Sequence, residues 1–167
     1  MKRFFISFTL IAALVGCTGT TSEEAMRMPA EQYLKIVASN PLGKTETLRV
    51  SRSLSAVEKS FNKAASSCLR QQHSSIDASG GMGHVTVQHN PKVYRDGSGV
   101  VLEIQQYHNN SGARLFLAKA KATSSGTVVT MAGPKLAHNV IFKHVRGYAQ
   151  GRGGCFKYPS QTGLLGM

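Results

Sequence analysis

The sequence predicts an α+β domain: an antiparallel sheet of about five strands, with two helices packed on one face. Three observations predict this class. Short segments of alternating apolar and polar residues recur between residues 85 and 131. Turns rich in Gly, Ser and Asn separate these segments, which is the pattern of antiparallel hairpins. Two longer segments, one on each side of the series, carry apolar residues at helical spacing.

The first strand and helix are expected after residue 44. A strand is predicted over residues 45–52, where Leu48 and Val50 share one face. A helix follows, and Ser55 with Glu58 fits a capping box, in which two side chains satisfy free backbone N–H groups. Its apolar stripe turns Cys68 toward the core and comprises Leu54, Val57, Phe61, Ala64, Ala65 and Cys68.

Four further strands and a second helix complete the order β-α-β-β-β-β-α. Residues 73–83 are expected to form a loop, and strands follow near residues 85–88, 100–105, 115–117 and 127–131. Gly133 and Pro134 are expected to open the second helix, because proline suits a first turn. Gly151 is expected to end it. This order is similar to that of helix-grip modules in some envelope lipoproteins, a resemblance that implies no activity.

The N-terminus has the pattern of a secretory leader. Lys2 and Arg3 precede an apolar run from Phe4 to Val15. This run is shorter than the roughly 20 apolar residues that span a bilayer, so a transmembrane helix is the less favoured interpretation.

The residues Leu14-Val15-Gly16-Cys17 that end this run resemble the lipobox of bacterial lipoproteins. In that family the Cys sulfur receives a diacylglyceryl group, the chain is cut before it, and the new amine usually receives a fatty acyl chain such as palmitate. The resemblance implies a membrane anchor at Cys17. It also implies an outer-membrane location facing the periplasm, because Thr18 replaces the Asp that tends to retain lipoproteins in the inner membrane. An ordinary cleaved signal peptide stays open as an alternative.

The chain therefore divides into four predicted parts. Residues 1–16 form the lipoprotein signal peptide, and residues 17–44 form a lipidated tether with a short helix from about Pro29 to Val37. Residues 45–159 form a single α+β domain, and residues 160–167 form a C-terminal tail. The length after cleavage suits one domain.

The mature chain is strongly basic. Without Lys2 and Arg3 it has 18 Lys and Arg residues against eight Asp and Glu, a net charge of +10 with His neutral. This charge favours an anionic partner such as lipopolysaccharide, anionic phospholipid, a cell-wall polymer or an acidic protein face. Export excludes nucleic acid as the expected partner. The alternative is that the charge only keeps the domain soluble.

Two cysteines remain after Cys17, namely Cys68 and Cys155. In an oxidising compartment this pair predicts a disulfide, while two buried free thiols remain the alternative. No metal site and no cofactor are expected, because neither cysteine belongs to a CxxC or Cys/His cluster. His84 and His89 lie five residues apart, so one strand turns them to opposite faces, and His108 does not complete a site.

Basic residues gather at two places, which makes them candidates for an anionic-partner patch. The first comprises Arg114, Lys119 and Lys121, and the second surrounds the second helix and includes Lys135, Lys143, Arg146 and Arg152. Phe142 is expected to be exposed beside the second group, and a solvated helix face is the alternative. His144 falls on the apolar side of that helix, where a buried neutral imidazole is expected rather than a catalytic or pH-sensing group.

No GxSxG, HExxH, Walker or Rossmann motif is present, so no catalytic residue is assigned. The leading hypothesis is a non-enzymatic envelope lipoprotein that binds or supports another envelope component. The second is a binder of anionic lipid or polymer. An envelope hydrolase assembled from scattered residues is the third.

Overall fold

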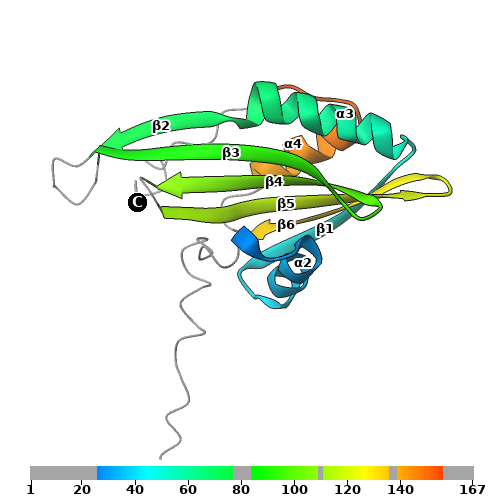
Figure 1. The fold of residues 1–167 in the computed structure, drawn as a ribbon, viewed down its shortest axis with the longest axis horizontal. Coiled ribbons are helices and arrows are strands. Elements are labelled where there is room, and N and C mark those ends of the chain that lie inside the picture. The colour runs from blue at the N-terminus through cyan, green and yellow to red at the C-terminus, as the bar shows by residue number, and fades with distance from the viewer. Residues whose placement is uncertain (1–25, 77–83, 109–110, 136–138, 156–167) are drawn as a thin grey trace, which may run out of the picture.

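The computed structural model describes residues 26–76, 84–108, 111–135 and 139–155. The predicted leader, Cys17 and the C-terminal tail lie outside these residues. One six-stranded sheet has the order β1-β6-β5-β4-β3-β2, and all neighbouring strands are antiparallel (Figure 1). The strands are β1 (Gly43–Val50), β2 (Gln71–Ile76), β3 (His84–Asp96), β4 (Gly99–His108), β5 (Ser111–Thr123) and β6 (Gly126–Pro134).

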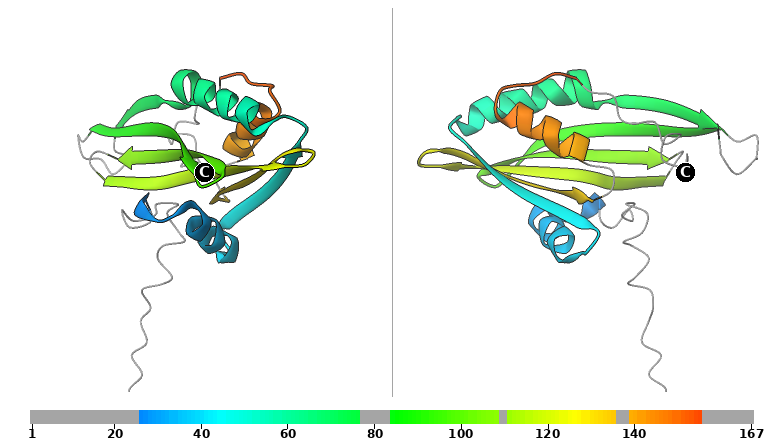
Figure 2. Two further views of the ribbon diagram at one scale, coloured as in Figure 1. Left: turned by 45° about the vertical axis from the view of Figure 1, so that its right-hand side comes forward. Right: turned by 180° about the vertical axis from the view of Figure 1, so that it is seen from behind.

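The helices lie on both faces of the sheet. Helices α3 (Leu54–Ala64) and α4 (Asn139–Ala149) cover one face, and α2 (Ala30–Ser39) lies on the opposite face (Figure 2). A π-helical turn, η1 (Ala65–Leu69), continues α3. The α+β class is therefore confirmed. The predicted count of five strands and two helices is wrong by one strand and one helix, since the short helix expected in the tether packs against the sheet.

The face under α3 and α4 is the main apolar core. Val57 and Phe61 of α3 and Ile141, Phe142 and Val145 of α4 pack on alternate residues of the strands and are almost fully buried. A smaller apolar cluster lies under α2 and comprises Ala30, Tyr33, Val37, Val101, Leu117 and Ala132. Strand β4 is thus buried on both faces over residues 100–102, which explains the three consecutive apolar residues there.

The sixth strand, β2, lies where the sequence predicts a loop. Its residues Gln71-Gln72-His73-Ser74-Ser75-Ile76 show no apolar alternation. As an edge strand it forms a ladder with residues 84–89 of β3 only. A polar strand is tolerated here because an edge strand pairs with a neighbour on one side only and leaves its other side to solvent.

The second helix begins later than predicted. Strand β6 continues through Gly133 and Pro134, and α4 begins at Asn139. Pro134 pairs with Gly43 at the end of the β1–β6 ladder, where a missing N–H donor removes little. The predicted end is close to the observed one. Gly151 has φ 78°, and its N–H and that of Arg152 donate to the Tyr148 and Gly147 carbonyls, which is a Schellman cap.

The predicted apolar stripe of α3 is confirmed, but the predicted cap is wrong. Ser53 is the N-cap residue, and its Oγ accepts from the Ala56 N–H at 3.3 Å. Glu58 instead forms an ion pair with Arg95 of β3. Ser53 comes just before the helix, and its extended backbone places its side chain where it can accept from the N–H of Ala56 in the first turn.

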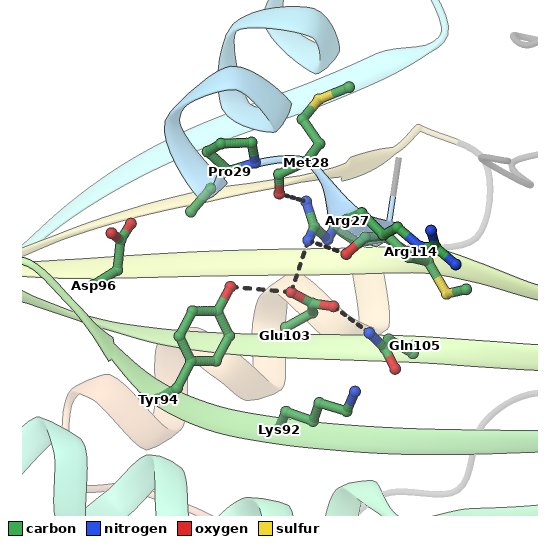
Figure 3. A pocket seen from close by; sticks show the side chains of 11 residues that line it. Arg27, Met28, Pro29, Lys92, Tyr94, Asp96, Glu103, Gln105 and Arg114 are labelled. Carbon is green, nitrogen blue, oxygen red and sulfur yellow. Dashed lines mark hydrogen bonds and ion pairs between the residues drawn. The ribbon is translucent and has the colours of Figure 1, made fainter. Parts of the chain in front are cut away.

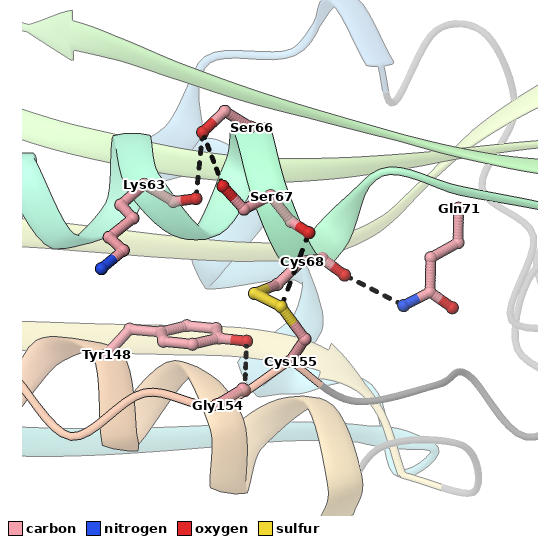
Figure 4. Close-up of a disulfide and its surroundings, with 8 residues drawn as sticks. All are labelled: Lys63, Ser66, Ser67, Cys68, Gln71, Tyr148, Gly154 and Cys155. Carbon is pink, nitrogen blue, oxygen red and sulfur yellow. Dashed lines mark hydrogen bonds between the residues drawn. A yellow bond between two sulfur atoms is a disulfide. The ribbon is translucent and has the colours of Figure 1, made fainter.

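Cys68 and Cys155 form a disulfide between η1 and the segment after α4 (Figure 4). They are separated by 87 residues in the sequence. Nearby, the Tyr148 hydroxyl donates to the Gly154 carbonyl at 3.1 Å. The bond therefore fastens the end of the chain's last described helix to the end of α3.

Arg52 joins the C-terminal end of α4 to the start of α3. Its Nη1 donates to the carbonyl oxygens of Tyr148 and Ala149 at 3.1 and 3.0 Å, and its Nη2 donates to that of Ala56 at 3.1 Å. A cation favours a helix C-terminus, where carbonyl groups lack partners. This side chain therefore caps α4 and fixes it against the start of α3.

Candidate functional site

The candidate site lies on the sheet face opposite α3 and α4. Helix α2 covers the β1, β6 and β5 side of this face, and residues Met26–Pro29, here called the strap, cross the part beside it. Between the strap and strands β3 to β5 is a pocket of about 330 Å³ (Figure 3). It is lined by Met26, Arg27, Met28, Pro29, Ala30, Lys92, Tyr94, Asp96, Glu103, Gln105 and Arg114.

The base of the pocket is a buried ion pair. Arg114 Nη2 lies 3.0 Å from Glu103 Oε2, and the two side chains are 2% and 3% exposed. The Glu103 carboxylate also accepts from the Tyr94 hydroxyl at 3.1 Å and from Gln105 Nε2 at 2.6 Å. Such a pair is tolerated away from water only when further hydrogen bonds satisfy both ions.

Arg114 also holds the strap. Its Nη1 donates to the Met28 carbonyl and its Nη2 to the Met26 carbonyl, both at 2.9 Å. The guanidinium lies 5.0 Å from the centre of the Tyr33 ring, and the Tyr33 hydroxyl donates to the Arg114 carbonyl at 3.3 Å. One side chain therefore binds the sheet, the strap and α2 together.

Tyr94 is the part of this network nearest the surface, since it is 38% exposed. Burial of its hydroxyl, together with the adjacent Glu103 carboxylate, raises the pKa of Tyr94 to about 12. The hydroxyl therefore stays protonated near neutral pH and remains a donor to Glu103. A general base is not expected from either group, because one is a phenol and the other already binds a cation.

A second ionic cluster fixes the start of α2 beside the pocket. Lys119 Nζ lies 2.6 Å from Asp96 Oδ2 and 3.1 Å from Glu31 Oε1, and Lys121 Nζ lies 2.7 Å from the same Glu31 oxygen. The hydrogen bonds from Lys121 and Lys119 lower the pKa of Glu31. Glu31 also lies in the first turn of α2, where the helix dipole favours a negative charge.

An irregularity in β5 turns Arg114 toward the strap. In a regular strand, residues 114 and 116 share a face, and Phe116 lies in the core under α3 and α4. The β4–β5 register shifts after Ile104, so that Gln105 pairs with Arg114 and Leu115 is the extra residue. This bulge moves Arg114 to the polar face.

Gly112 provides the room beside this network. A Cβ atom there would lie 2.6 Å from the Tyr107 ring and 2.9 Å from the Met26 methyl group. The Tyr107 hydroxyl donates to Gln105 Oε1 at 2.9 Å, which extends the network from Glu103. Glycine therefore allows the tyrosine and the strap to approach β5 closely.

The basic groups predicted from the sequence differ in their placement. Arg114 and Lys119 are buried in ion pairs, so the first group is wrong as a surface patch; Lys121 alone of the three is exposed. In the second group, Arg146 forms an ion pair with Glu46 at 2.7 Å and Lys135 Nζ donates to the Pro41 carbonyl at 3.3 Å. Lys143 and Arg152 are exposed. Lys135 precedes α4 and Arg152 follows it.

The remaining residues singled out from the sequence are Phe142 and four histidines. Phe142 is fully buried, so its expected exposure is wrong; it packs edge-to-face on Phe116 with ring centres 5.0 Å apart. His144 is half-buried with its ring 6.3 Å from that of Tyr148. His89 is buried, and the side chains of His84 and His108 lie outside the described part.

Among the described residues, no three or more His, Cys, Asp or Glu side chains are grouped so that they could hold a metal ion, and none of the helices has the length and apolar character of a membrane span. No protein-family model matches the chain, and no curated protein sequence matches it.

Replacing Arg114 by Met should lower the free energy of unfolding by about 3–5 kcal/mol, because Glu103 then stays buried without its cation. The double variant Glu103→Leu/Arg114→Met should recover much of this loss. In both variants trypsin should cut faster after the exposed Arg27, because the strap carbonyls lose their donor. Chemical denaturation and timed proteolysis measure these effects.

The matched control is Arg95→Met, which breaks the exposed ion pair with Glu58. It should cost much less than Arg114→Met, because solvent screens such pairs. Equal costs for Arg95→Met and Arg114→Met would contradict the role given to the buried pair.

Acid should weaken the attachment of α2. The folded-state pKa of Glu31 lies below its ordinary value of 4.5, so its ion pairs stabilise the fold above pH 4.5 and are lost as the pH falls through the lowered value. Glu31→Gln should therefore be less stable than the wild type at pH 7, with the difference vanishing in strong acid. Denaturation between pH 7 and pH 2 measures this. As a control, the neighbouring Gln32→Ala variant should keep the pH dependence of the wild-type stability. If Glu31→Gln lowered the free energy of unfolding by the same amount at every pH, the role given to the Glu31 carboxylate would be refuted.

Proposed function

We propose that the protein is an exported, lipid-anchored module of the cell envelope that binds another envelope component without catalysing a reaction. The observation that carries this proposal is the disulfide between Cys68 and Cys155. Such bonds persist in oxidising compartments such as the periplasm. It agrees with the leader and with the lipobox that places the anchor at Cys17.

The strap supports a definite orientation for the anchored domain. Met26 lies nine residues after Cys17, so a fully extended tether reaches about 30 Å. Because Arg114 fixes the strap to the polar face of the sheet, the tether leaves the domain on this face. In the proposed orientation, the α2 side and the pocket face the membrane, and the α3 and α4 side faces away from it.

The chemistry of the pocket supports binding rather than catalysis. Its two carboxylates, Glu103 and Asp96, each contact a cation, Arg114 and Lys119 respectively. A general base or nucleophile needs an oxygen that can accept a proton or attack. The hydrolase alternative gains no specific observation from this arrangement.

The second candidate, a binder of anionic lipid or polymer, is favoured by the charge balance. In the described ranges there are 17 Lys and Arg residues and five Asp and Glu, and each of those five acids is in an ion pair. Most of the positive charge is thus left without an acidic partner in these ranges. Binding to anionic vesicles that weakens steeply with salt would support this candidate, and salt-independent binding would exclude it.

Mass spectrometry of the protein from its native host tests the anchor. The mature N-terminal peptide should begin at Cys17 and carry a diacylglyceryl group and a fatty acyl chain, while the Cys17→Ser variant should carry neither. Cross-linking on intact cells should then join the wild type to a specific envelope component. An N-terminus without acyl chains, or free thiols at Cys68 and Cys155 in freshly isolated protein, would contradict the proposal.

A further inference from the structure

The pocket under the strap has more positive than negative charge. Glu103 is balanced by Arg114, and Asp96 shares Lys119 with Glu31. Two further cations line the pocket, Arg27 on the strap and Lys92 on β3, and both are exposed. Within the described part of the chain, no carboxylate lies within ion-pair distance of either.

Lys92 is held close to the buried pair without joining it. It lies directly opposite Glu103 across the β3–β4 ladder. The Glu103 oxygens already accept from Tyr94, Gln105 and Arg114. The Lys92 ammonium can therefore bind an anion that enters the pocket. Figure 3 shows Lys92 beside Gln105 on the sheet, with Arg27 on the strap above it.

From this arrangement we infer that the pocket binds the phosphate of a small headgroup, such as a glycerol phosphate. Arg27 and Lys92 supply the two cations, and a guanidinium with an ammonium is a combination that proteins use for phosphate. The half-exposed Tyr94 ring offers an apolar wall for the carbon atoms of the headgroup. A volume of about 330 Å³ falls at the small end of ligand pockets.

The strap gives a reason for this ligand to come from a membrane. Arg27 belongs to the same segment that continues toward Cys17, so the pocket opens beside the root of the proposed anchor. A domain held within about 30 Å of a bilayer meets lipid headgroups at high effective concentration. This source rests on the proposed function, whereas the phosphate chemistry of the pocket does not.

The test uses the full mature protein in detergent and compares two double variants of equal charge. Arg27→Gln/Lys92→Gln removes both pocket cations. Lys59→Gln/Lys63→Gln removes two exposed cations from α3, on the opposite face of the sheet. Calorimetry with glycerol 1-phosphate gives the affinity of the pocket. Co-sedimentation with vesicles of phosphatidylglycerol or phosphatidylcholine tests the membrane source, with the same three proteins carrying Cys17→Ser so that they lack the acyl anchor and need no detergent.

The pocket variant should bind glycerol 1-phosphate at least about tenfold more weakly than the wild type, since charge-assisted hydrogen bonds to the phosphate are lost. The α3 variant should stay within about twofold. Binding to phosphatidylglycerol vesicles should rank the three proteins in the same order. Binding to phosphatidylcholine vesicles should be the same for the wild type and both variants. If both variants lost the same affinity for glycerol 1-phosphate, net charge alone would explain the binding and the inference would be overturned.

Absence of glycerol 1-phosphate binding by the wild type would also overturn it. That failure would be distinct from failure of the proposed function, because an acylated Cys17 would leave the lipoprotein proposal intact. Conversely, pocket-dependent binding by a protein without acyl chains would keep the site and remove its membrane source.

Discussion

The ion pair between Glu103 and Arg114 is the interaction on which the second face of the sheet depends. Two charges lie almost fully buried on neighbouring strands, and such a pair needs further hydrogen bonds to both ions to offset the loss of water. Tyr94 and Gln105 donate hydrogen bonds to Glu103, and the two strap carbonyls accept hydrogen bonds from the two terminal nitrogens of Arg114. The strap is therefore part of the fold rather than a loose connection to it.

The two faces of the sheet therefore differ in structure and in proposed role. The face under α3 and α4 supplies the apolar core, and the Cys68–Cys155 bond with the Arg52 cap keeps its two helices together. The opposite face has a smaller apolar cluster under α2 and leaves a polar pocket beside it. In the proposed arrangement, the first face holds the domain together and the second meets the membrane and its ligands.

Periodicity predicted the elements whose patterns are strong: the stripe of α3, the alternation in β4 and β6, and the glycine that ends α4. It could not predict β2, because a polar edge strand has no apolar alternation to detect. The pocket was missed for a related reason. Arg114 and Lys119 look like surface charges in the sequence, and the bulge that turns Arg114 inward depends on the pairing of β4 with β5. One signal was available: Glu103 stands within the apolar run from Val100 to Ile104, and a carboxylate in a strand buried on both faces requires a cation.

The most direct test of this account is the orientation of the domain on a bilayer. A fluorophore attached at Lys35→Cys on α2 or at Lys63→Cys on α3 reports the distance of each side from vesicles that carry a headgroup quencher; both positions are exposed. For the full lipidated protein, we expect strong quenching of the α2 label and little quenching of the α3 label. Equal quenching of the two labels, or stronger quenching of the α3 label, would show that the strap does not fix the polar face toward the membrane.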